Sequence, residues 1–144
     1  MREILFRGQT RKKGQKVWVD GTPVDGEWVY GGVLQGVGDF SVIYGGKNQN
    51  DYGEDLQKWC VYTDTLGQFT GLTDKKGKRI FEGDICRVSR PCVLAYGKIT
   101  FQNGCFWFVD DGPGGMLRLC DVKTNGFEIE VIGNIHDNPE LLEG

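Results

Sequence analysis

The chain lacks the residues from which most metal and catalytic sites are built. It contains one histidine, His136, and no two of its five cysteines have Cys-x-x-Cys spacing. Structural zinc sites use cysteine and histidine ligands at such short spacings, so we expect no zinc site. His136 is expected in a turn between a strand and a helix. Because no other residue suggests a nucleophile with its base, we expect no enzymatic activity and no cofactor.

Long hydrophobic runs are also missing. A membrane-spanning helix needs about 20 consecutive apolar residues, and a secretory signal needs an apolar core of roughly 7–15 residues. Neither pattern occurs in the sequence, and the cysteine count is odd. Together these features predict a soluble protein of a reducing cytoplasm.

The chain has no excess of positive charge. It carries 17 lysines and arginines against 20 aspartates and glutamates, a formal net charge of −3. This balance argues against a protein that coats nucleic acid by bulk electrostatics.

What the chain has in quantity is glycine. Its 23 glycines are scattered among aromatic and β-branched residues, at more than twice the ordinary share of about 7%. This combination predicts short strands joined by tight turns, and therefore an all-β fold. The main expected strands cover residues 17–19, 27–30, 40–44, 56–62, 93–101, 105–109, 116–120 and 127–135.

The stretch of residues 67–88 is expected to form a hairpin that leads into a longer strand. Asp74-Lys75-Lys76-Gly77 predicts a turn in which the aspartate accepts local amide hydrogen bonds and the glycine adopts a positive φ. Glu82-Gly83-Asp84 predicts a second corner. Its two carboxylates could in principle bind a divalent metal, but a turn whose aspartate bonds local amides is the simpler interpretation.

Two further segments carry strong local signals. Asn103-Gly104 predicts a hairpin turn, and residues 105–109 after it are so apolar that we expect this strand to be covered on both faces. Near the end, Asn138, Pro139 and Glu140 have the order expected at a helix start, which predicts one short helical turn. No other segment is predicted to be helical.

Four blocks of the sequence carry a family resemblance that covers nearly the whole chain in order. The blocks are Phe6-Arg7-Gly8, Trp28-Val29-Tyr30-Gly31, Gly67-Gln68-Phe69-Thr70-Gly71-Leu72-Thr73-Asp74-Lys75-Lys76-Gly77 with Ile80-Phe81-Glu82-Gly83-Asp84-Ile85, and Val131-Ile132-Gly133-Asn134-Ile135-His136-Asp137-Asn138-Pro139-Glu140-Leu141. They resemble YopX-type proteins of bacteriophages and Gram-positive prophages, most specifically in the central and C-terminal blocks.

The resemblance implies an all-β, YopX-like protein that forms homo-oligomers and has no assigned catalytic residues. Its expected organisation is a single unit with three parts: an N-terminal β-meander (1–66), a small SH3-like barrel (67–135) and a C-terminal helical tail (136–144). The family has no established function, although nucleic-acid binding has been suggested for it on structural grounds. Such an analogy of fold alone does not establish a function.

Nucleic-acid binding is the sharper functional hypothesis. Small β-barrels bind single strands with aromatic platforms flanked by cations, and Phe69 and Phe81 lie close in sequence to such cations. Arg7, Arg11, Lys12 and Lys13 could extend this surface. The alternative is that the hairpin cations are solvated turn residues and the two phenylalanines are core. The candidate residues are Lys75, Lys76, Lys78, Arg79, Arg87 and Arg90.

Protein association is the rival hypothesis. The glycine-rich first half contains Trp18, Trp28, Tyr30 and Trp59, more large aromatics than one small sheet easily buries, and some of them would suit a subunit contact. At the other end, Leu141 and Leu142 are expected to anchor the tail in a groove of the same or a neighbouring subunit. The sequence thus predicts a non-enzymatic oligomeric binding module, with nucleic acid as the first partner class and another protein as the alternative.

Overall fold

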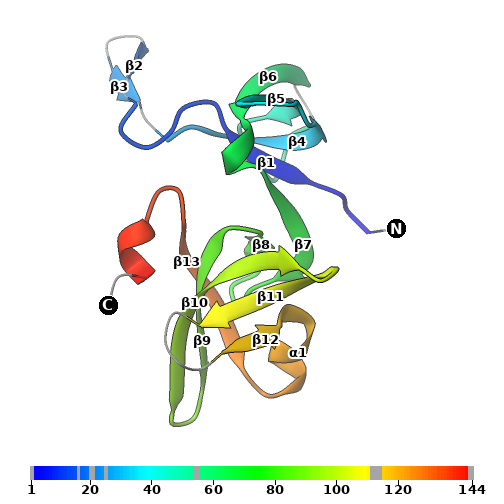
Figure 1. Ribbon diagram of the computed structural model, residues 1–144, viewed down its shortest axis with the longest axis vertical. Coiled ribbons are helices and arrows are strands. Elements are labelled where there is room, and N and C mark those ends of the chain that lie inside the picture. The colour runs from blue at the N-terminus through cyan, green and yellow to red at the C-terminus, as the bar shows by residue number, and fades with distance from the viewer. Residues whose placement is uncertain are drawn as a thin grey trace. The chain divides into compact units, whose positions relative to one another are not determined.

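The computed structural model describes residues 2–15, 17–19, 22–24, 26–53, 56–110 and 115–142, with backbone alone at 17–19 and 22–24. The chain forms two compact units, Met1–Gln68 and Phe69–Gly144, called here the first and second units. Both are built mainly of antiparallel strands (Figure 1). The side chain of Trp18, one of the predicted contact aromatics, lies outside the described part.

The first unit contains most of a six-stranded sheet with the order β6-β5-β4-β1-β7-β8. Strand β7 starts in the first unit, where Gly67 and Gln68 pair with β1, and continues into the second, where it pairs with β8. The elements up to this point are β1 (Phe6–Gln9), β2 (Val17–Val19), β3 (Thr22–Val24), β4 (Trp28–Leu34), β5 (Phe40–Gly46), β6 (Gln57–Tyr62), the 3-10 turn η1 (Thr63–Thr65) and β7 (Gly67–Thr73).

Strand β4 continues through Gly31 and Gly32, whereas the predicted strand ended at Tyr30, and β5 ends at its own glycine pair, Gly45 and Gly46. Gly31 of β4 lies opposite Gly45 of β5. A Cβ atom on Gly31 would lie 1.9 Å from the Tyr44 carbonyl oxygen, and one on Gly45 would lie 1.8 Å from that of Tyr30. The predicted end at Tyr30 was therefore wrong, because glycine here permits a close approach of two strands and does not break β4. Val29, Ile43 and Val61 form the buried core beside this contact.

The second unit contains a five-stranded sheet with the order β12-β11-β10-β9-β13. The predicted hairpin at Asn103-Gly104 is confirmed: both residues have positive φ, 53° and 76°, and they join β10 to β11 with Gln102 opposite Cys105. The remaining elements are β8 (Arg79–Phe81), β9 (Asp84–Arg90), β10 (Val93–Gln102), β11 (Cys105–Asp110), β12 (Met116–Arg118), α1 (Leu119–Thr124), β13 (Glu128–Asn134) and the 3-10 turn η2 (Pro139–Leu142).

Helix α1 corrects the prediction of a strand over residues 116–120. The strand ends at Arg118 and a short helix follows (Figure 1). Leu119 and Val122 are both buried in the core of the second unit. Residues three apart share one face of a helix but opposite faces of a strand, so burying both side chains requires the helix.

Strand β11 is less buried than expected. Phe108 is buried, but Phe106 and Trp107 keep part of their surface exposed. The Phe106 ring lies against Phe101, with 5.1 Å between ring centroids, and the Trp107 indole N–H donates to the Gln102 carbonyl. The expectation of cover on both faces was wrong, because Phe106 packs on Phe101 within the hairpin and Trp107 satisfies its indole N–H on the hairpin backbone.

The described strands of the second unit form an open sheet in which no closed barrel is detected. The short C-terminal helical turn is confirmed as η2. No helix within the described ranges is long and apolar enough to cross a membrane.

Candidate functional site

The turn that precedes β8 is built around the carboxylate of Asp74. Its Oδ1 atom accepts hydrogen bonds from the backbone N–H groups of Lys76 and Lys78, both at 2.9 Å. Its Oδ2 atom accepts one from Val131 of β13 at 3.0 Å. Gly77 has a φ of 80°, as this turn requires. The predicted turn is confirmed, and Asp74, only 4% exposed, also binds the turn to β13.

Three of the predicted nucleic-acid residues converge on one glutamate. In β13, Ile129 and Val131 are buried, while Glu130 lies on the opposite face and pairs across the ladder with Arg87 of β9. Glu130 lies 2.6 Å from Arg87, 3.0 Å from Lys76 and 3.5 Å from Lys75. Their positive charges are thus partly neutralised before any ligand arrives.

The pKa of Glu130 reflects this surrounding charge. The hydrogen bond from Lys76 lowers the pKa most, and the charges of Lys76, Arg87 and Lys75 add to it. Partial desolvation opposes the shift, but the pKa remains below its ordinary value of 4.5. Glu130 is therefore ionised at neutral pH and reduces the positive field of the hairpin.

The other three predicted residues have separate surroundings. The guanidinium of Arg79 lies over Phe69 at 5.7 Å, and that of Arg90 lies over Phe127 at 4.5 Å while Nη1 donates to the Asn125 carbonyl. Phe69 and Phe81 are buried and pack together, so they offer no platform for a base. Lys78 is exposed, and its side chain makes no ion pair with any described residue.

The arginines proposed to extend this surface are also engaged. Arg7 is buried, with its guanidinium 4.6 Å from the centre of the Trp28 ring. Arg11 forms an ion pair with Glu27 at 2.6 Å. Arg7 is therefore a core residue, contrary to the sequence-based expectation.

The Glu82-Gly83-Asp84 corner has a structural explanation. Asp84 is buried, and its Oδ2 atom accepts the N–H of Phe81 at 2.7 Å. His136 lies in the turn after β13, where its N–H donates to Asn134 Oδ1. Within the described ranges, no three histidine, cysteine, aspartate or glutamate side chains gather as metal ligands would.

The C-terminal leucines lie on η2. A Cβ on Gly133 would come within 2.9 Å of Leu141 Cδ1, so Leu141 packs directly on the β13 backbone of the same chain. Leu141 remains 40% exposed, and Leu142 is only partly buried. Residue Gly133 allows this close approach of η2.

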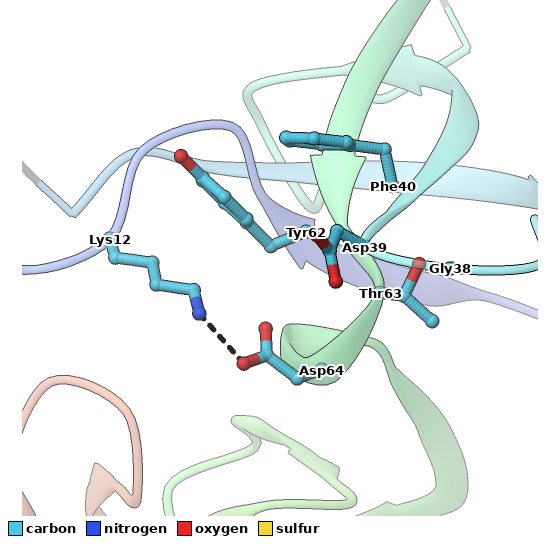
Figure 2. Close-up of a pocket in the computed structure, with 7 residues that line it drawn as sticks. All are labelled: Lys12, Gly38, Asp39, Phe40, Tyr62, Thr63 and Asp64. Atoms are coloured by element: carbon cyan, nitrogen blue, oxygen red, sulfur yellow. Dashed lines mark hydrogen bonds and ion pairs between the residues drawn. The ribbon is translucent and has the colours of Figure 1, made fainter.

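A pocket of about 470 Å³ lies in the first unit and was not predicted from the sequence; it is called here the Tyr62 pocket. Figure 2 shows its lining from the loop after β1, the loop that leads into β5, the start of β5, the end of β6 and η1. The lining residues are Lys12, Gly38, Asp39, Phe40, Tyr62, Thr63 and Asp64.

An aromatic pair forms one wall of the Tyr62 pocket. Phe40 and Tyr62 lie opposite each other on β5 and β6, with ring centroids 5.0 Å apart. Phe40 is 52% exposed. Two hydrogen bonds fix the backbone on either side of this pair. The Thr63 N–H donates to the Asp39 carbonyl at 2.8 Å, and the Ser41 and Thr63 hydroxyls bond to each other.

Charged groups of both signs meet beside this wall. Lys12 Nζ lies 2.7 Å from Asp64 Oδ2 and 4.7 Å from the centre of the Tyr62 ring (Figure 2). The Asp39 carboxylate makes no ion pair with any residue in the described ranges. With one lysine and two aspartates, the lining has a formal charge of −1.

No short motif marks this pocket, because its parts are brought together by the β5/β6 register. The available signal was an aspartate next to an aromatic residue in Asp39-Phe40, and an aspartate two residues after an aromatic in Tyr62-Thr63-Asp64. A partly exposed aromatic pair with carboxylates beside it can bind an apolar or cationic group. The net negative charge of its lining makes the pocket poorly suited to phosphate.

Comparison with known proteins gives a family and a fold. The family model described as YopX protein matches residues 24–143. The crystal structure of protein EF1440 from Enterococcus faecalis is similar to this chain, with a TM-score of 0.54, 22% sequence identity and 99% coverage of each chain. At that identity the likeness shows the fold alone. No curated protein matches the chain.

Proposed function

Because this chain belongs to the YopX family, we propose that it is a non-catalytic, phage- or prophage-encoded module that binds another protein through the Tyr62 pocket. The Phe40–Tyr62 ring pair, with Phe40 exposed and two carboxylates in the same pocket lining, is the observation that supports this function. Aromatic residues in a recessed site are typical anchors of protein interfaces. The negative lining disfavours a phosphate backbone, so a protein is the better-supported partner class.

Selection of peptides tests this proposal without a known partner. The full chain, immobilised, is used to select from a random peptide display library, and the peptides obtained are synthesised and titrated by calorimetry. We expect Phe40→Ala to weaken their binding by about tenfold or more, as for an anchor residue. Phe101→Ala is the matched control, because Phe101 is equally exposed, at 51%, but lies on β10. Equal losses in both variants, or no selected peptide, would count against the proposal.

Nucleic acid remains the second candidate, and Lys78 and Arg90 are what favour it, because both are exposed and neither belongs to the cluster of cations around Glu130. The test is fluorescence anisotropy with single-stranded DNA, single-stranded RNA and duplex DNA at low and physiological salt. We expect no saturable binding at physiological salt. Binding that falls steeply with salt and is lost on reversing Lys78 and Arg90 to glutamate would instead support this candidate.

Homo-oligomer formation through the tail is a further proposal, supported by the exposed part of Leu141 on η2. We expect truncation after Ile135 to lower the melting temperature and to reduce the mass measured by light scattering. Leu141→Ser, which keeps the rest of η2, should reproduce the change in mass. If truncation alters neither quantity, the tail anchors nothing.

We also propose that the second unit is an incomplete SH3-like barrel. Strands β9, β10, β11 and β12 form a meander, and β13 returns after a helical turn to pair with β9. This strand order is the one found in SH3-like barrels. An experimental structure in which β13 did not pair with β9 would contradict it.

The five free thiols support a cytoplasmic location in the host, which fractionation of infected or lysogenic cells would test.

A further inference from the structure

Lys12 occupies the Tyr62 pocket in the way that a cationic ligand would. Its ammonium group lies over the Tyr62 ring, with Nζ 4.7 Å from the centroid, and forms an ion pair of 2.7 Å with Asp64. A ring face combined with a carboxylate is the arrangement with which proteins bind organic cations. The chain itself therefore shows which ligand chemistry this wall accepts.

The contact made by Lys12 is weak enough to be exchanged. The side chains of Lys12 and Asp64 are 39% and 68% exposed. An ion pair so open to water contributes little, because solvent screens its attraction and holding a long flexible side chain costs entropy. Lys12 lies in the loop between β1 and β2, where a turn with Gln15 holds its backbone, so only the Lys12 side chain has to move.

The pocket retains negative charge after Lys12 is counted. Asp39 lines it together with Asp64, and Lys12 is the single cation among the lining residues. The volume of about 470 Å³ leaves room beside the Lys12 ammonium for another side chain. Charge complementarity therefore favours an incoming cation, and Phe40, exposed at the edge of the wall, can cover its aliphatic stem.

We propose that the Tyr62 pocket binds an arginine side chain of a partner protein, and that this guanidinium displaces Lys12 from Tyr62 and Asp64. The inference rests on the proposed function and names the group recognised at the same site. Arginine suits the pocket better than lysine, because its planar guanidinium stacks on an aromatic ring and carries five N–H donors for two carboxylates. Displaced Lys12 returns to solvent, where its ammonium is well hydrated.

The probe is a capped Gly-Arg-Gly peptide titrated into the ¹⁵N-labelled full chain. We expect saturable shifts of the backbone amides of Tyr62, Thr63 and Asp64. The same peptide with citrulline, an uncharged analogue of arginine of similar shape, should cause no such shifts. Asp39→Asn and Asp64→Asn should each weaken binding of the arginine peptide.

Displacement of Lys12 is tested by Lys12→Gln. Removing the internal competitor should tighten arginine binding about two- to fivefold, the range expected for the loss of one exposed ion pair. Lys13→Gln is the matched control, because it removes the same charge from the neighbouring residue outside the pocket lining and should not tighten binding. Tighter binding in Lys12→Gln alone, together with the citrulline result, supports the proposal.

The failures of the two proposals are distinguishable. If the arginine peptide binds at the pocket but Lys12→Gln leaves its affinity unchanged, the displacement is overturned and the protein-binding function stands. If arginine and citrulline peptides shift the same amides equally, recognition of the cation is overturned. If neither peptide shifts these amides while binding of the library peptides still depends on Phe40, recognition of arginine is overturned. The proposed protein-binding function of the pocket then remains.

Discussion

Asp74 shows how much one buried carboxylate can organise. It accepts three backbone hydrogen bonds, two within its own turn and one from β13. Replacing it leaves three N–H groups without this acceptor, and the cost of an unsatisfied buried donor is about 1–3 kcal/mol. Its role in the second unit is therefore structural, although it stands next to the lysines considered for nucleic acid.

We expect Asp74→Ala to lower the free energy of unfolding by about 2–4 kcal/mol, measured by urea denaturation. Asp51→Ala, at an exposed loop position, is the control and should change stability by less than about 0.5 kcal/mol. Similar losses in the two variants would show that the hydrogen bonds of Asp74 contribute little.

Glu27 gives the first unit a pH dependence. Its partial burial raises the pKa, but hydrogen bonds from Thr10 and Lys47 and the charges of Lys47 and Arg11 outweigh this effect. The pKa therefore lies below the ordinary value of 4.5. A carboxyl whose pKa is lowered on folding stabilises the fold above 4.5, and this contribution disappears as the pH falls through the lowered value.

We expect the melting temperature to fall on acidification below pH 4.5, and Glu27→Gln to lose less stability than the unchanged protein over the same range. Differential scanning calorimetry at neutral pH and at about pH 3 makes the comparison. An equal fall in both proteins would assign the acid sensitivity to other carboxylates.

At the scale of elements, helix α1 is the clearest test of the fold, because helix and strand place Leu119 and Val122 differently. We expect Leu119→Ala to cost about 2–4 kcal/mol and Val122→Ala about 1.5–3 kcal/mol of unfolding free energy. Cys120→Ala, on the exposed side, should be close to neutral. A strand would bury only one of the two positions, so a large loss at one and none at the other would contradict the helix.

The same contrast explains which elements could be predicted. The turns at Asp74 and Asn103-Gly104 follow from neighbouring residues alone, so their sequences suffice. The strand predicted at residues 116–120 ends at Arg118, because core burial of Leu119 and Val122 decides the structure after it. The contacts of Glu130 with Arg87, and of Phe40 with Tyr62, depend on registers between strands distant in sequence. Local patterns cannot reveal such pairs.

At the scale of the molecule, each unit has a core of its own. Ile43 belongs to the buried cluster of the first unit and Ile99 to that of the second. Regions with separate cores can open separately, and such openings are measured by amide hydrogen exchange.

We expect Ile43→Val to speed exchange mainly in β4 and β5, and Ile99→Val mainly in β9, β10 and β11, by about 2- to 10-fold. The substitutions are chemically identical, so each variant is the control for the other. If both variants speed exchange equally throughout the chain, the two units unfold as one.

The turn held by Asp74 also blocks the outer edge of β13. Lys75 donates its N–H to the Ile129 carbonyl at 2.9 Å, and Asp74 takes the N–H of Val131. An open sheet edge can recruit a strand from another molecule and start aggregation. Opening this turn would expose the Ile129 carbonyl and the Val131 N–H at the edge of β13, a strand with one apolar face. We therefore expect Asp74 also to protect the protein against amyloid-like association. Concentrated samples of Asp74→Ala should scatter more light than the unchanged protein at the same concentration.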